Sequence, residues 1–212
     1  MSNAAISRRE LLILTLAARL NASDSDFWNK KQPSAWSPEE IERLLTQSPW
    51  AKEITPTYTS LPPPPTDRRP WGENPPIYGG PVKPPRSLKA PYQATVRWES
   101  ADPIRSAQKA ALPAAFSDYH VVGIYFSYAT RKDLGSKPLE NLQQSAVLTG
   151  TSAVDAEMVK VHPQIMDGFL IGFPKTSTRG VRQFEFSCRI GFLALKAKFN
   201  IGEMLYHGQL AL

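Results

Sequence analysis

The chain has 212 residues, of which 42% are hydrophobic, and a formal net charge of +6. That length is enough for one well-cored domain. The basic residues are spread thinly and never form the concentrated basic stripe, with aromatic side chains for stacking, that is typical of nucleic-acid binding. We therefore expect no nucleic-acid partner and interpret the charge as one that keeps the protein dispersed in water.

The N-terminal residues 1–22 have the order of an export signal. Two arginines, Arg8 and Arg9, stand before a mainly apolar stretch over residues 11–18, and small residues follow around Ala22. This order is typical of a cleavable secretory signal, and the arginine pair resembles a twin-arginine signal. The alternative is an ordinary amphipathic first helix, since Leu11, Leu14 and Ala18 also share a helical face.

A membrane span is not predicted anywhere in the chain. The apolar stretch of the signal has roughly eight residues, whereas a spanning helix needs about 20. No other stretch of the sequence comes closer to that length. We expect an exported protein, periplasmic or extracellular, without a transmembrane segment.

Residues 23–54 are predicted to be a tryptophan-bearing helical segment. Ser37 and Glu40 form a capping-box pattern around Pro38, and apolar residues then recur at helical spacing. The pattern predicts a helix to about Gln47, ended by Pro49.

Tryptophans surround this helix and give the candidate partner-binding residues. Exposed aromatic side chains at this density are typical of a binding face for a sugar or a protein groove. The alternative is that those beside the helix pack onto the C-terminal domain, because one short helix is not stable alone. The candidates are Trp28, Trp36 and Trp50, with Trp71 further along the chain.

Several distinctive strings resemble an uncharacterised family of exported bacterial proteins. The resemblance covers both ends of the mature chain and leaves out the proline-rich stretch between them. It implies export and a shared fold, and it implies no catalytic residue. The strings are FWNKK, WSPEEI and SPWAKE before residue 54, VRWESA at 96–101, and LKAKF and MLYHGQL after residue 194.

Residues 55–91 are predicted to form an extended linker. More than half of the chain's 20 prolines fall here. Prolines remove amide donors, so the stretch favours a semi-rigid, polyproline-like conformation over a helix or sheet. We favour a spacer or a strap along the domain surface, with a ligand for an aromatic-lined groove as the alternative.

Residues 92–212 are predicted to form an antiparallel β-sandwich, immunoglobulin-like in outline. Apolar and polar residues alternate in short segments that are separated by turn-forming residues. Because no long helix is predicted between them, two packed sheets are the expected architecture. The expected strands cover 92–98, 120–128, 146–148, 156–161, 168–173, 183–190, 192–201 and 204–212.

Cys188 is the single cysteine, which excludes an internal disulfide and a thiolate metal cage. Its alternating segment places it on the apolar face of a strand, so we expect a buried side chain. A nucleophile paired with His120 or His207 is the alternative, but no nucleophile elbow surrounds it.

The other polar candidates are equally weak. His162 and the two histidines above have no partner at metal-ligand spacing. Asp155 and Glu157 are expected to be a surface pair, with calcium as the alternative. Lys196 and Lys198 are expected on a solvated strand face, with an anion site as the alternative. No catalytic residue, metal site or cofactor is therefore predicted.

Two functional hypotheses follow. The first is an exported, non-enzymatic module that binds an envelope partner or has a structural role in the envelope. The second is a hydrolase-like enzyme whose site is assembled from distant residues. A histidine that meets Cys188 or a carboxylate in a cleft would favour the enzyme.

If residues 1–22 are a cleaved signal, the protein recovered from its host will begin after that segment. N-terminal sequencing of the purified native protein measures this directly. A mature chain that still carries residues 7–20 intact would contradict the prediction of a cleaved signal.

Overall fold

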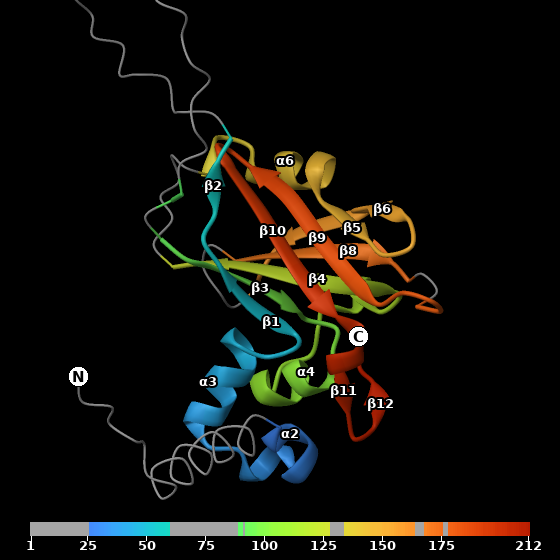
Figure 1. Ribbon diagram of the computed structural model, residues 1–212. Coiled ribbons are helices and arrows are strands. Elements are labelled where there is room, and N and C mark those ends of the chain that lie inside the picture. Colours follow the sequence, from blue (N-terminus) through green and yellow to red (C-terminus); the bar gives the residue numbers. More distant parts are fainter. Residues whose placement is uncertain (1–25, 60–88, 91, 128–133, 164–167, 176–177) are drawn as a thin grey trace, which may run out of the picture.

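The computed structural model describes residues 26–59, 89–90, 92–127, 134–163, 168–175 and 178–212. Most regular structure in this part of the chain is β-strand, arranged in two large antiparallel sheets (Figure 1). The predicted export signal, most of the proline-rich linker and Trp71 lie outside the described residues.

Each sheet has five strands, and all neighbours are antiparallel. In spatial order, the first sheet contains β1 (Ala51–Ile54), β3 (Ala94–Trp98), β4 (Tyr119–Phe126), β8 (Gly168–Pro174) and β7 (Met158–Val161). The second contains β2 (Thr57–Tyr58), β10 (Leu193–Asn200), β9 (Gln183–Ile190), β5 (Val147–Thr149) and β6 (Ala153–Asp155).

This arrangement agrees with the predicted mainly antiparallel sandwich. The immunoglobulin-like outline is not established by it, because an immunoglobulin constant domain has four strands in one sheet and three in the other. A further difference is at the C-terminal end. Residues 204–212 were expected to be one strand, but they form the small hairpin of β11 (Leu205–Tyr206) and β12 (Gln209–Leu210).

At each edge of the sandwich, the chain passes directly from an edge strand of one sheet to an edge strand of the other. At one side β1 pairs with β3, and after Pro56 the chain continues as β2 beside β10. At the other side the amide of Ala156 donates to Ala146 beside the second sheet, whereas the next amide, that of Glu157, donates to Gly172 in the first. These crossings leave short edge strands and bind the two sheets together.

The end of the predicted helical segment and the first residues of the predicted linker are thus part of the sandwich, and the expectation that the linker contributes no strand is wrong for β2. The sequence prediction placed the sandwich from residue 92 onward, but β1 and β2 supply an edge strand to each sheet. The indole Nε1 of Trp50, just before β1, donates a buried hydrogen bond of 2.7 Å to the carbonyl of Ala211 near the C-terminus. This bond ties the segment just before β1 to the C-terminal end of the chain.

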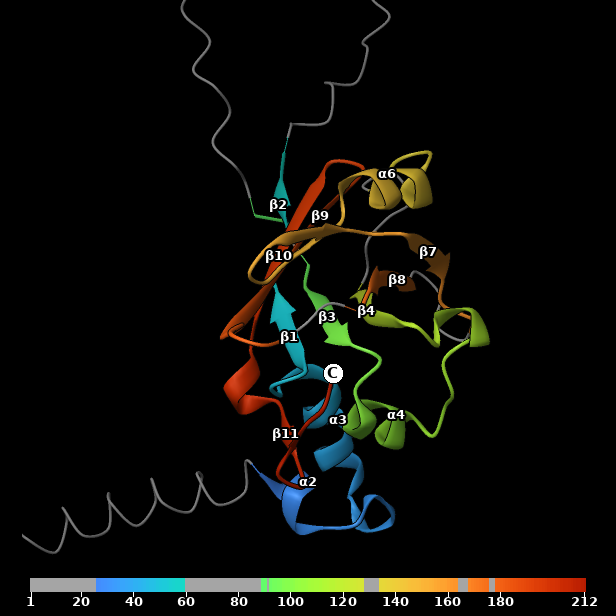
Figure 2. The same ribbon diagram turned by 90° about the vertical axis from the view of Figure 1, so that its right-hand side faces the viewer.

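Helices occupy the ends of the sandwich. Figures 1 and 2 show α2, α3, α4 and the β11–β12 hairpin together at one end and α6 at the other. No helix among the described residues is long and apolar enough to cross a membrane. The helical segments are α2 (Phe27–Lys30), η1 (Pro33–Ala35), α3 (Pro38–Thr46), α4 (Asp102–Gln108), η2 (Ala114–Phe116), α6 (Pro138–Ser145) and η3 (Ile201–Glu203).

Helix α3 begins with the capping box that its sequence shows. The Ser37 hydroxyl accepts from the Glu40 amide at 3.2 Å, and the Glu40 carboxylate accepts from the Ser37 amide at 2.9 Å. The apolar stripe of this helix turns Leu44 into the core. Past its end, the Ser48 hydroxyl donates to the Leu44 carbonyl at 2.6 Å, which satisfies one of the open carbonyls of the last turn.

Helix α6 was not predicted. Its eight residues start at Pro138, which is favourable in a first turn, but only Leu142 is buried among them. The helix is held by side-chain bonds to neighbouring elements, such as the 2.7 Å bond from the Gln143 amide to the Ala156 carbonyl. A mostly polar helix of this kind depends on tertiary contacts and leaves a weak pattern in the sequence.

The core lies between the two sheets and is rich in aromatic side chains. Trp98 is fully buried at its centre, with its ring 5.2 Å from Phe184 and 5.5 Å from Phe199 between centroids. Contacts of this kind stabilise beyond the area they bury. The core therefore joins β3 of the first sheet to β9 and β10 of the second.

Replacing Trp98 tests this inter-sheet contact. We expect Trp98→Ala to lower the free energy of unfolding by about 3–5 kcal/mol, because it leaves a large cavity between the sheets. Leu205→Ala removes a 40% exposed apolar side chain, and its effect is expected to stay within about 0.5 kcal/mol. Urea unfolding of both variants measures the difference, and equal losses would contradict the central role of Trp98.

Candidate functional site

The tryptophans predicted to bind a partner are mostly in the core. Trp28 and Trp36 are 7% and 6% exposed, and Trp50 is fully buried. The rings of Trp28 and Trp36 pack edge-on against Phe27 at 5.1 Å and 5.7 Å between centroids. These side chains present little surface to a partner, as the packing interpretation of the sequence expects.

The nucleophile and base candidates are not brought into a common hollow. Cys188 is buried on the inner face of β9, where burial raises the pKa of its thiol well above the ordinary value. His120 lies in the core, its ring 5.6 Å from that of Trp98, and His207 occupies the tight turn between β11 and β12 with a φ of 49°. Within the described ranges, no group of three or more His, Cys, Asp or Glu residues is arranged to hold a metal ion.

A buried charged cluster lies on the outer face of the first sheet. The Arg97 guanidinium forms an ion pair with Glu99, and both side chains are almost completely buried. The Tyr125 hydroxyl donates to the same Glu99 oxygen at 2.6 Å, while the Arg97 guanidinium lies 4.2 Å from the centre of the Tyr125 ring. His162 packs edge-on against that ring at 5.6 Å.

Two glycines make room for this cluster. A Cβ at Gly123, opposite Arg97 in the sheet, would lie 2.6 Å from the Tyr125 hydroxyl and 2.9 Å from the Glu99 side chain. A Cβ at Gly168 would lie 3.0 Å from the His162 Cβ and 3.1 Å from the Tyr125 ring. The tyrosine ring therefore lies flat over a part of the sheet that carries no side chains.

The electrostatics of the cluster keep it in one charge state. Burial, the largest single effect, would lower the pKa of Arg97, but the interactions with Glu99 and Tyr125 together more than offset it, so the pKa is raised. Burial, followed by the Glu99 charge, raises the pKa of Tyr125, and burial lowers the pKa of His162. Arg97 thus stays charged and Tyr125 stays neutral, which fits a structural role for the cluster, called here a structural brace because it holds its side chains in one arrangement.

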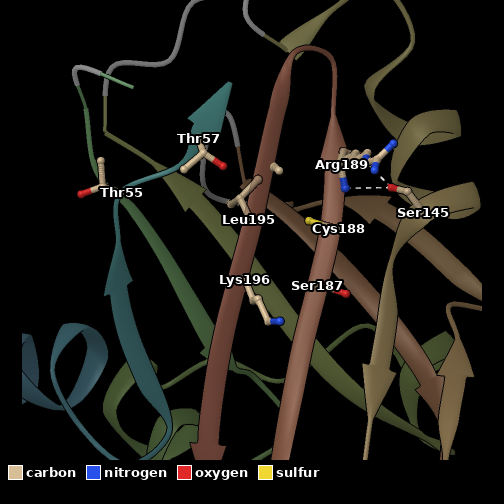
Figure 3. A pocket seen from close by; sticks show the side chains of 9 residues that line it. Thr55, Thr57, Ser145, Ser187, Cys188, Arg189, Leu195 and Lys196 are labelled. Atoms are coloured by element: carbon tan, nitrogen blue, oxygen red, sulfur yellow. Dashed lines mark hydrogen bonds between the residues drawn. The ribbon is translucent and has the colours of Figure 1, made fainter. Parts of the chain in front are cut away.

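A groove of about 610 Å³ lies over the outer face of the second sheet (Figure 3). Its floor is the half of the β9–β10 hairpin next to the turn, and its sides are the segment leading into β2 and the end of α6. The groove is hollow because Ala194, whose small side chain points outward, stands between Thr57 on β2 and Arg189 on β9. Thr55, Ser145, Ser187 and Lys196 complete the polar lining.

The end of α6 is fixed to this groove by one hydroxyl. The Ser145 hydroxyl accepts from the Arg189 amide at 2.9 Å, and its single hydrogen is shared between the Asn141 carbonyl at 2.6 Å and the Arg189 carbonyl at 2.8 Å. Figure 3 shows Ser145 opposite the Arg189 backbone, with Thr55 and Thr57 on the far side of β10. The groove is therefore a rigid surface, with two well-paired strands as its floor.

Lysines on the same face form ion pairs. Lys196 and Lys198 lie 2.6 Å and 3.6 Å from the two oxygens of Glu185, and all three side chains point outward. The strand face is solvated, as its alternation indicates, and these contacts lower the pKa of Glu185, chiefly through the bond from Lys196.

A second hollow of about 590 Å³ lies between α3 and β1. It is bordered by Trp28 and by charges of both signs, including Arg43, Lys52 and Glu53. The Glu53 carboxylate accepts a bond of 3.0 Å from the Gln47 amide. Because this hollow mixes both signs of charge and engages its own polar groups, it is less suited to a charged ligand than the groove on the second sheet.

The sequence predicted neither the buried charged cluster of Arg97 and Glu99 nor the groove on the second sheet, for a physical reason. Arg97 and Glu99 alternate with Trp98, which predicts a solvated face, and only the fold shows that this face is covered. The groove depends on Thr57, which lies within the predicted linker, and on α6, which was not predicted. The outward Ala194 beside two lysines was the only local sign of a hollow.

No protein-family model, curated protein or solved structure matches this chain in the comparisons made. The resemblance to a family of exported bacterial proteins therefore stays a prediction.

Removing one partner of the buried ion pair is expected to be costly. Glu99→Gln leaves the Arg97 charge buried without its carboxylate, so we expect the free energy of unfolding to fall by about 3–5 kcal/mol. The double change Arg97→Met with Glu99→Leu should recover much of that loss, because it removes both charges.

The exposed pair Lys137–Glu140 on α6 provides the control. Glu140→Gln should change the free energy of unfolding by less than about 1 kcal/mol. Urea unfolding of all three variants measures these values, and a Glu99→Gln effect as small as the control would show that the buried pair is not a structural brace.

Proposed function

We propose that this protein is an exported, non-enzymatic module that binds an envelope partner through the groove on the second sheet. The observation that supports the proposal most directly is the chemistry of the groove. It offers hydroxyls and two cationic side chains to solvent, while Cys188, the one thiol at its border, is turned into the core. These groups suit recognition by hydrogen bonds and charge.

The position of the groove also favours a binding role. Binding groups on paired strands are held more firmly than groups on loops. Here β9 and β10 pair over eight residues, from Leu193 with Ile190 to Asn200 with Gln183. The free energy that binding must spend on ordering the backbone of the groove is therefore small.

Export is the second part of the proposal and rests on the sequence. The arginine pair and short apolar stretch within residues 1–22 are typical of a signal, and the strings that resemble exported bacterial proteins point the same way. An envelope location follows from these patterns.

A hydrolase-like enzyme is less well supported by the geometry. It requires a histidine and a carboxylate or thiol in a hollow that admits a substrate. His162 comes nearest, through Tyr125 to Glu99, but the hollow that it borders measures only about 10 Å³. That volume is about the size needed for a single water molecule.

Site-specific photocrosslinking in the native cell envelope tests the proposal. A photoreactive residue in place of Thr55, at the rim of the groove, should give a discrete adduct. The same residue in place of Lys160, exposed on β7 of the other sheet, should not. Adducts that are identical from both positions, or absent from Thr55, would contradict binding through the groove.

A further inference from the structure

The groove on the second sheet has a one-sided charge that indicates its ligand. Among the described residues, its lining contains Arg189 and Lys196 and no carboxylate, and the nearby Glu185 carboxylate pairs with Lys196 from outside the lining. On the basis of the binding function proposed above, we propose that the groove binds an extended acidic segment of a partner protein, with two carboxylates held by Arg189 and Lys196.

Arg189 is available for such a contact. Its backbone amide and carbonyl are engaged by Ser145, but its side chain is exposed. The ion pairs found among the described residues do not include its guanidinium. A guanidinium accepts a carboxylate in a two-bonded geometry, which gives both affinity and orientation.

Lys196 can turn to a ligand at low cost. Its partner Glu185 is also within 3.6 Å of Lys198, so that carboxylate keeps a cation if Lys196 moves. The Lys196 side chain is 62% exposed, and an exposed ion pair of this kind contributes only about 0–1 kcal/mol. A ligand carboxylate in the groove is therefore able to compete for Lys196.

The strand positions that carry the two cations match the spacing of an extended peptide. Ala194 pairs with Arg189 and Lys196 pairs with Ser187, so the two cations are diagonal neighbours on one face. Diagonal neighbours lie about 7–8 Å apart. Residues i and i+2 of an extended chain are separated by about 7 Å, so alternate residues of a bound strand have the same spacing as the strand positions that carry Arg189 and Lys196.

The remaining lining favours a peptide over a sugar. Thr57 and Ser187 supply hydroxyls that can donate to and accept from backbone amide groups, whereas the Thr55 hydroxyl donates to Gln93 at 3.1 Å and can still accept. Among the residues that the structure describes, no aromatic side chain borders the groove, so these residues offer no stacking surface of the kind that sugar rings use.

Fluorescence anisotropy with the full mature chain tests the proposal. The probe is a labelled peptide of about eight residues that alternates glutamate and serine. In extended form, a peptide of this length is longer than the distance between the strand positions of Arg189 and Lys196. The matched control peptide carries glutamine in place of each glutamate. We expect the acidic peptide to bind measurably, the glutamine peptide to bind at least about tenfold more weakly, and the affinity to fall as salt is raised.

Paired variants assign the binding to the groove. Arg189→Gln with Lys196→Gln should weaken binding by at least about tenfold, since two charge-assisted contacts are lost. Lys137→Gln with Lys160→Gln removes the same charge from exposed positions elsewhere and should weaken it less than about twofold. Equal weakening by both pairs, or none by the first, would overturn the proposal.

Competition distinguishes the ligand classes. Inorganic phosphate or a uronic-acid oligosaccharide that binds more tightly than the acidic peptide would overturn the assignment to a peptide. If Thr55 still gives its adduct while the acidic peptide fails to bind, only the ligand assignment is wrong. If the adduct is absent as well, the proposed binding function fails with it.

Discussion

The structure depends on two places where the backbone leaves one sheet and joins the other. Pro56 separates β1 from β2, and the successive amides of Ala156 and Glu157 donate to opposite sheets. Proline has no amide hydrogen to lose at such a change of partner. Because the sheets share these strands, their relative position is set by covalent connection as well as by the Trp98 aromatic contacts.

This frame gives the two sheets different outer faces. In the first sheet β4 and β8 are buried on both faces, and a second apolar cluster of Phe116, Val121 and Leu170 covers part of the outer one. The charged Arg97–Glu99 pair is enclosed on the same face. In the second sheet β10 buries only alternate residues, so its outer face meets solvent and supports the groove. The covered face stabilises the fold, and the open face is available for recognition.

Charge has a different consequence on each face. Where Arg97 and Glu99 are enclosed, the attraction between them offsets a large desolvation cost, so the pair holds one arrangement. Where Lys196 and Glu185 are exposed, water screens the attraction, so the pair contributes little to stability. The buried ion pair thus helps to fix the structure of the first sheet, whereas the exposed ion pair on the second sheet contributes little to stability.

The sequence by itself determined the strands that follow a period of two, the capping box of α3 and the inward side of β9 with Cys188, because these depend on neighbours in the chain. It left open whether Trp28, Trp36 and Trp50 form an exposed binding face or pack onto the C-terminal domain, because burial depends on what surrounds a side chain. Only the tertiary structure decided that β1 and β2 belong to the sandwich and that α6 covers one end. The groove and the charged cluster followed from that, since each joins residues more than 25 positions apart in the sequence.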